Sequence, residues 1–211
     1  MGREVTQEMK AELRADGKLY ITGYVNVPGR ESRPVMTPRG RVNEIIEPRA
    51  FAEALDEADD IVMLIDHDRN HQVASRNDGS LNVKEDQIGL RAEAVVEDES
   101  TKAAAMNGEL RGWSFNIIDP VDEVEERANR LPLRRIKKLK MNEISLIIHK
   151  VPVYSATMVE VRGEDEMTVE YRGIEEDSQF TMQEQPKMPE KSDPKPDYTE
   201  KYNNRINALR L

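Results

Sequence analysis

The 211-residue chain contains no cysteine, and both aromatic residues (5%) and histidines (three) are scarce. Without cysteine there can be no disulfide, no thiolate metal site and no cysteine nucleophile, which directs the search for a nucleophile to serine. Histidine is the usual general base near neutral pH, and only His67, His71 and His149 can supply it.

Long apolar runs and excess positive charge are also absent. The longest apolar run, Ile61–Ile65, is far shorter than the ~20 residues of a membrane span, and the N-terminus has no signal-peptide core, so we expect a cytoplasmic protein. A formal net charge of −10 argues against nucleic-acid binding, which needs a positive surface. The one basic run, Arg134–Lys140, alternates with apolar residues and is interpreted as a solvated edge strand.

Apolar residues become rarer towards the C-terminus, which predicts three regions: a folded core over 1–162, a flexible acidic and proline-rich linker over 163–197, and a short amphipathic segment over 198–211. Residues 183–197 contain four prolines and a single apolar residue, Met188. The final segment has an apolar stripe at helical spacing, formed by Tyr198, Tyr202, Ile206 and Leu209. We expect this tail to be disordered until the last segment docks on a partner.

Strand signals outnumber helix signals within the core. Helices are predicted over 50–58 and 100–107, and strands over 18–27, 61–65, 80–84, 88–96, 112–118 and 139–148. Residues 28–40 are predicted to form a loop, and so is the acidic stretch that follows Pro120. This pattern favours an α+β domain built on an antiparallel sheet or barrel.

His67 follows the predicted buried strand and lies between two aspartates. It could share a metal with His71 only if this segment were helical, which the preceding strand argues against. The residues from Asp66 onward imitate a calcium loop, but His71 replaces the required glycine and Asn77 replaces the bidentate glutamate. We therefore expect no metal site around His67.

Ser114 lies between the only tryptophan, Trp113, and Phe115. On a strand it would point away from these two aromatic side chains. A hydroxyl held on a rigid strand suits a nucleophile for acyl transfer, although most strand serines have no catalytic role.

Glu143 lies on an otherwise apolar strand, and an unpaired carboxylate would be costly there. Its partner could be an arginine such as Arg135, in a purely structural pair. Alternatively, it could orient a histidine and complete a hydroxyl, imidazole and acid relay with His67 and Ser114.

The order and spacing of several segments resemble the prohead (procapsid maturation) proteases of tailed phages over roughly residues 15–162. The matching segments are 43–51, 65–68, 89–94, 108–115, 142–146 and 152–154. That family is similar to the herpesvirus assemblins, so the resemblance implies a β-barrel-like core surrounded by helices. It also implies that His67 is the base and Ser114 the nucleophile, with Glu143 as the third member and His149 as the alternative.

The resemblance further implies a serine endopeptidase that acts inside the procapsid in the host cytoplasm and works as a dimer. Its substrates would be scaffold or major capsid protein segments and the chain itself, with self-cleavage expected within 183–197 and docking through 198–211. The alternatives are a catalytically silent scaffolding protein of the same fold and an acidic partner-binding module. No cofactor, nucleic acid or membrane is expected to take part.

Overall fold

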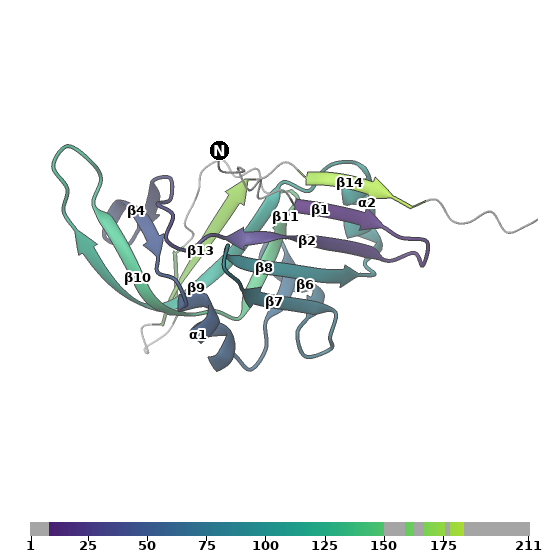
Figure 1. Cartoon of the computed structure of the whole chain (residues 1–211), viewed down its shortest axis with the longest axis horizontal. Helices are drawn as coiled ribbons and strands as arrows, with labels where there is room; N and C mark the ends of the chain where they lie inside the picture. The colour runs from purple at the N-terminus through teal and green to yellow at the C-terminus, as the bar shows by residue number, and fades with distance from the viewer. Residues whose placement is uncertain (1–8, 150–158, 163–166, 176–177, 184–211) are drawn as a thin grey trace, which may run out of the picture.

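The computed structural model describes residues 9–149, 159–162, 167–175 and 178–183, which form two β-sheets and two helices (Figure 1). The α+β class expected from the sequence is confirmed. Neither sheet closes on itself among these residues, so the described strands form no complete barrel. Residues 184–197 and the segment 198–211 lie outside the described residues.

The smaller sheet is antiparallel except at one edge, where β14 runs parallel to β1. Buried and partly exposed residues alternate along β2 and β8, as expected for strands with one face on a core. The strand order across this sheet is β14 (Ser178–Met182), β1 (Met9–Leu13), β2 (Leu19–Asn26), β8 (Leu90–Val96) and β7 (Leu81–Glu85).

The larger sheet is built around the long strand β9, which has β10 and β11 along one edge and β13 along the other. The main strand order is β3 (Val35–Thr37), β4 (Gly40–Ile46), β10 (Leu133–Lys140), β9 (Gly112–Glu125), β11 (Glu143–Ile147), β5 (Val62–Ile65) and β6 (Asp68–Ser75). Beyond it, β13 (Met167–Glu175) pairs with β9, and β12 (Val159–Arg162) pairs with β13.

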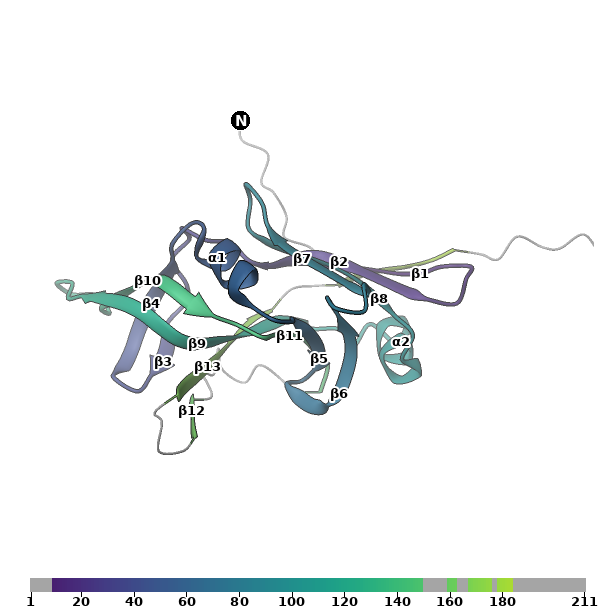
Figure 2. The ribbon, with the colours of Figure 1, turned by 90° about the horizontal axis from the view of Figure 1, so that it is seen from below.

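The hydrophobic core lies between the sheets and beneath helix α1 (Ala50–Glu57), which contacts β7 and β10 (Figure 2). Phe51 of α1 meets Phe115 of β9 edge to face, with ring centroids 5.3 Å apart. Gly23 of β2 gives the Trp113 indole room, because a Cβ at position 23 would lie 2.7 Å from Trp113 Nε1. Trp113 and Phe115 thus anchor β9 in the core on either side of Ser114.

Helix α2 (Glu99–Met106) begins at Asp98, whose carboxylate accepts hydrogen bonds from the Thr101 backbone N–H and from the hydroxyls of Ser100 and Thr101. Partial burial alone would raise the pKa of Asp98, but these bonds and His71 outweigh it and lower the pKa to about 2. The ionised carboxylate is therefore a strong N-cap. Neither described helix is long and apolar enough to span a membrane.

Replacing Asp98 with alanine should lower the free energy of unfolding by about 1 kcal/mol, whereas Asp98→Asn should retain most of the cap. Because the pKa of Asp98 is lowered in the folded chain, its contribution exists above its ordinary pKa of 3.8 and is lost as the pH falls towards 2. Urea unfolding at pH 7 and pH 2.5 checks this result. An equal difference between the Asp98→Ala variant and the native chain at both values would contradict it.

Three expectations about secondary structure are wrong. The loop expected over 28–40 contains β3, which forms a hairpin with β4. Arg134–Lys140 is no solvated edge, because β10 pairs with β9 on one side and with β4 on the other. Strand β9 does not stop at Pro120 but runs on to Glu125 through a bulge, where Asp119 has a φ of 46°. A bulge lets the strand include a residue that has no N–H to donate.

Two strands, β13 and β14, lie within the stretch expected to be a linker. The prediction of a linker from residue 163 is therefore wrong for residues 167–175 and 178–182. Both strands pair with partners more than 50 residues away in sequence, β9 and β1. Such long-range pairing left no local signal in the composition.

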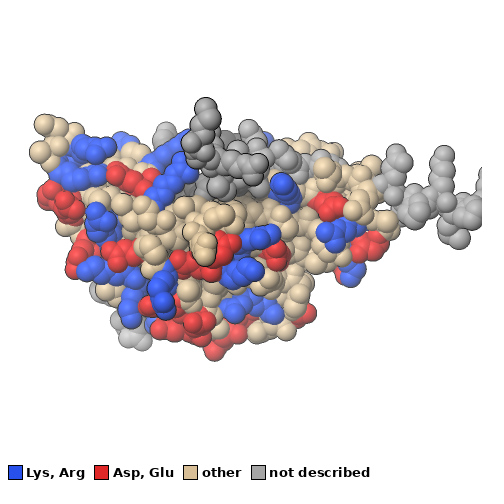
Figure 3. Space-filling view, viewed as in Figure 1, with Lys and Arg blue, Asp and Glu red and all other residues tan. Residues whose placement is uncertain are grey.

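Charged side chains of both signs are interspersed on the face of the molecule seen in Figure 3. Lysines and arginines lie beside aspartates and glutamates over most of this face. Elsewhere on the described surface, contacts between opposite charges include Lys137 with Glu123 and Lys18 with Glu97. That face therefore carries no broad basic patch.

Candidate active site

His67 lies in the sharp turn between β5 and β6. Asp66 and His67 both have left-handed backbone conformations, with φ values of 51° and 61°, which are uncommon for residues with side chains. The Asp66 carboxylate holds the turn by accepting hydrogen bonds from the backbone N–H groups of Ile148 and His149, at 2.9 and 3.0 Å. The turn that carries His67 is thereby fixed to the end of β11.

Ser114 lies near the start of β9 and is 2% exposed. In the sheet it is flanked by Ser145 of β11 and Gly173 of β13. Its Oγ lies 2.7 Å from His67 Nε2 and donates a hydrogen bond of 2.7 Å to the carbonyl oxygen of Arg172. Ser114 thus contacts both the imidazole and the backbone of β13.

Glu143 is the first residue of β11, and its carboxylate lies on the other side of the imidazole. Glu143 Oε1 is 2.5 Å from His67 Nδ1, and both side chains are almost fully buried. Asn116 Oδ1 accepts hydrogen bonds from the backbone N–H groups of Asn142 and Glu143, each at 3.2 Å. Ser145 Oγ is also 3.2 Å from His67 Nδ1. These contacts fix the carboxylate where it can orient the imidazole.

The contacts of Ser114, His67 and Glu143 form one continuous relay. An ionised Glu143 accepts the Nδ1 proton of His67, which leaves Nε2 free to accept the hydroxyl proton of Ser114. The hydroxyl has a single proton, so it can donate either to His67 Nε2 or to the Arg172 carbonyl oxygen, but not to both at once. In this structure the serine oxygen is within hydrogen-bond distance of both acceptors.

The other candidates lie elsewhere. His149 has an exposed side chain, and its Nδ1 is 2.9 Å from Asp66 rather than next to His67. Arg135 lies beside Glu125, at 4.0 Å, and not beside Glu143. His71 lies 3.5 Å from Asp98, and in the described part of the chain no group of three or more His, Asp or Glu side chains is arranged to hold a metal ion.

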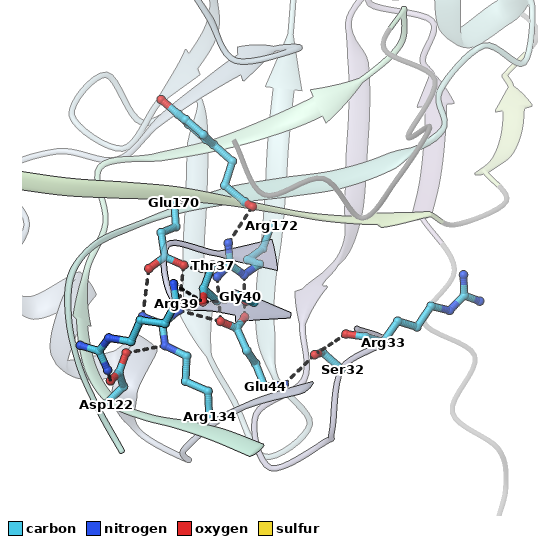
Figure 4. Close-up of polar contacts among 11 residues, drawn as sticks. Ser32, Arg33, Thr37, Arg39, Gly40, Glu44, Asp122, Arg134, Glu170 and Arg172 are labelled. Atoms are coloured by element: carbon cyan, nitrogen blue, oxygen red, sulfur yellow. Dashed lines mark hydrogen bonds and ion pairs between the residues drawn. The ribbon is translucent and has the colours of Figure 1, made fainter. Parts of the chain in front are cut away.

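A buried cluster of ion pairs includes two residues of β13, Glu170 and Arg172 (Figure 4). The guanidinium of Arg172 binds Glu44 through Nε, at 2.6 Å, and Nη2, at 2.7 Å, and Nη2 also contacts Glu170. The guanidinium of Arg134 contacts Glu44, Glu170 and Asp122. These ion pairs between guanidinium groups and carboxylates link β13 to β4, β9 and β10.

These pairings control the protonation of the cluster. Burial alone would lower the pKa of Arg172 and of Arg134, but the carboxylates raise both, with Glu44 first for Arg172 and Glu170 first for Arg134. Burial alone would likewise raise the pKa of Glu170, but the two guanidinium groups lower it below its ordinary value. All three groups are therefore charged near neutral pH.

The model of the caudovirus prohead serine protease family matches residues 5–170 of the chain. The chain belongs to this family. The match includes Ser114, His67 and Glu143, and it confirms the family resemblance expected from the sequence motifs. No curated protein and no solved structure matches the chain.

Membership of the prohead protease family implies a serine peptidase of capsid maturation, acting on capsid or scaffold proteins in the procapsid of a phage-infected cell. The sequence had marked Ser114, His67 and Glu143 as candidates, and the fold brings their side chains into contact. The sequence did not indicate that Asn116 positions Glu143 or that Asp66 positions His67. Asn116 gave a weak signal, since it lies on the Ser114 face of the strand, whereas the partners of Asp66 follow only from the parallel pairing of β5 and β11.

Proposed function

We propose that this chain is the serine endopeptidase that cuts scaffold or capsid-protein segments, and itself, by acyl-enzyme chemistry during procapsid maturation. The observation that carries the proposal is the unbroken contact path from Ser114 Oγ through both ring nitrogens of His67 to Glu143, at 2.7 and 2.5 Å. Family membership supports the same chemistry. The likeness to the herpesvirus assemblins is part of the same proposal, and with it a dimer.

The mechanism follows from the three side chains. His67 Nε2 takes the proton of Ser114 as Oγ attacks the carbonyl carbon of the substrate, and Glu143 stabilises the resulting imidazolium through Nδ1. The peptide C–N bond then breaks, and His67 returns the proton to the leaving amine. A water molecule, deprotonated by His67, hydrolyses the ester and regenerates Ser114.

Incubation with the cognate capsid precursor tests this proposal. The purified native chain should convert the precursor into shorter products with new N-termini, detected by intact-mass spectrometry. Parallel reactions with the Ser114→Ala and His67→Ala variants should leave the precursor uncut. Equal processing in all three reactions, or none by the native chain under assembly conditions, would contradict the proposal, and the second result would favour the silent scaffolding alternative.

Asp66 should act as a positioning residue for His67. Asp66→Asn removes the charge and one acceptor of the clamp, so we expect kcat to fall by about tenfold or more with little change in KM, because the imidazole is displaced from Ser114. His149→Ala, which removes only the exposed partner of the same carboxylate, should change kcat by less than about twofold. Equal losses in the two variants would argue against positioning through the backbone clamp.

A further inference from the structure

Strand β13 covers the proposed active site with the chain's own backbone. It pairs antiparallel with β9 from Val169 opposite Ile118 to Glu175 opposite Gly112, which places Gly173 opposite Ser114. The Tyr171 ring lies against the His67 ring, with centroids 4.4 Å apart. Both the nucleophile and the base are therefore in contact with this one segment.

The position of β13 is that of a bound peptide. Proteins commonly bind extended peptides by adding them as a strand to an exposed sheet edge, with main-chain hydrogen bonds giving affinity and side-chain pockets giving specificity. The carbonyl oxygen of Arg172 accepts a hydrogen bond of 2.7 Å from Ser114 Oγ, so this carbonyl group lies next to the nucleophile. For acyl transfer the carbonyl must turn so that its carbon faces Oγ, and the next bond, Arg172–Gly173, would then be the one that breaks.

The Arg172 side chain is bound by two buried carboxylates. Its guanidinium makes a two-pronged contact with Glu44, which is 4% exposed, and a further contact with Glu170 (Figure 4). Planar guanidinium groups match carboxylates in this way better than any other side chain does. Glu44 comes from β4 in the body of the domain, whereas Glu170 lies on β13 itself. The body of the domain therefore contributes the Glu44 carboxylate, which binds the side chain of the residue whose carbonyl group would react.

We propose that β13 is an intramolecular substrate, that Ser114 cuts the bond between Arg172 and Gly173, and that Glu44 makes the enzyme prefer arginine on the acyl side of the bond it cleaves. This inference rests on the proposed function. The family match ends at residue 170, so a cut after Arg172 leaves the whole matched region intact. The cut lies upstream of the self-cleavage region, 183–197, that the sequence had suggested.

The step is a complete peptide hydrolysis. Ser114 Oγ bonds to the carbonyl carbon of Arg172 while its proton passes to His67 Nε2, and the C–N bond to Gly173 then breaks as His67 protonates the new amine. Water hydrolyses the Arg172 ester to a carboxylate. Attack begins only when the hydroxyl turns from the Arg172 oxygen to His67, because a hydroxyl that donates its hydrogen bond to that carbonyl cannot give its proton to Nε2.

Intact-mass spectrometry of the full chain tests the position of the cut. The native chain, incubated alone, should yield a fragment ending at Arg172 and a complementary fragment beginning at Gly173. The Ser114→Ala variant should stay whole. A self-cleavage product that depends on Ser114 but ends at another residue would overturn the assignment.

A peptide assay tests the arginine preference without altering the folded chain. The probe is a synthetic peptide of residues 168–177, compared with the same peptide carrying leucine at the Arg172 position. We expect the native chain to cleave the arginine peptide at least about tenfold faster, by kcat/KM. In the Glu44→Gln variant this ratio should fall towards one, whereas the matched variant Glu125→Gln, which alters an exposed carboxylate on β9, should keep it.

The outcomes separate this inference from the proposed function. If the native chain cuts the capsid precursor through Ser114 but neither itself after Arg172 nor the arginine peptide, β13 is a structural strand and the inference is wrong while the protease remains. If no reaction depends on Ser114, both are wrong.

A loss of arginine preference in Glu44→Gln is meaningful only for folded protein, so circular dichroism and a thermal melt of both glutamine variants accompany the assay. A Glu44→Gln variant that stays folded and keeps the preference would overturn the role of Glu44.

Discussion

Replacing Ser114 with alanine is expected to reduce the rate of capsid-precursor cleavage by about 10⁴-fold or more, while the fold is retained. The variant loses the hydroxyl that lies 2.7 Å from His67 Nε2, so no acyl-enzyme can form. Its effect on the free energy of unfolding should be no more than about 1–2 kcal/mol, since the loss is one hydroxyl with two partners, His67 Nε2 and the Arg172 carbonyl oxygen. Single-turnover cleavage and urea unfolding measure the two quantities.

Members of one catalytic relay should show non-additive losses. The double variant with alanine at both Ser114 and His67 should be no slower than Ser114→Ala alone. Glu143→Gln keeps the shape of the carboxylate but can favour the wrong imidazole tautomer, and we expect a loss of about 10³- to 10⁴-fold. Multiplicative losses in the double variant, or a Glu143→Gln rate close to that of the native chain, would show that these side chains do not act as one unit.

Replacing Arg134 with alanine should lower the free energy of unfolding by about 3–5 kcal/mol. The substitution leaves three buried carboxylates, those of Glu44, Asp122 and Glu170, with one guanidinium fewer to neutralise them. Arg135→Ala is the matched control, because this neighbouring arginine is partly exposed and lies 4.0 Å from Glu125, which is exposed too. It should cost less than about 1 kcal/mol. Similar losses in the two variants would contradict the buried-cluster interpretation.

The same cluster should make stability depend on pH. Because the pKa of Glu170 is lowered in the folded chain, its stabilising contribution is present above its ordinary pKa of 4.5 and is lost as the pH falls through the lowered value. The native chain should therefore lose stability on acidification below about pH 4.5. In Arg134→Ala the lowered pKa loses its main cause, so unfolding measured from pH 7 to pH 3 should show a smaller acid dependence.

Much of the local structure could be predicted because its causes are local. Helix α1 follows a proline and has an amphipathic spacing, and the β7–β8 hairpin is marked by alternating apolar residues around a turn. Scarcity narrowed the candidates for the site, since the chain has no cysteine and only three histidines, and the family resemblance then implied the roles of Ser114, His67 and Glu143. The contacts of His67 with Ser114 and Glu143 agree with that choice of residues.

What could not be predicted depends on which strands become neighbours. Nothing near Arg134 in the sequence indicates that Glu44 and Glu170, 90 and 36 residues away, lie within reach of its guanidinium. The stretch around Glu170 is rich in charge and reads as a solvated linker, although two of its charges are neutralised in the interior. Likewise, β9 continues past Pro120 only because a bulge against β10 accommodates the proline.

The parallel pairing of β14 with β1 gives the proposed cut an unusual product. Residues 178–182 lie beyond the Arg172–Gly173 bond, yet they form main-chain hydrogen bonds with residues 9–13 at the opposite end of the sequence. Hydrolysis would therefore yield a nicked molecule of two chains held together without a covalent bond. Denaturing electrophoresis would separate the pieces, whereas native mass spectrometry would still record their combined mass. Release of the piece that begins at Gly173 would then depend on the separation of the edge strand β14 from β1 rather than on hydrolysis itself.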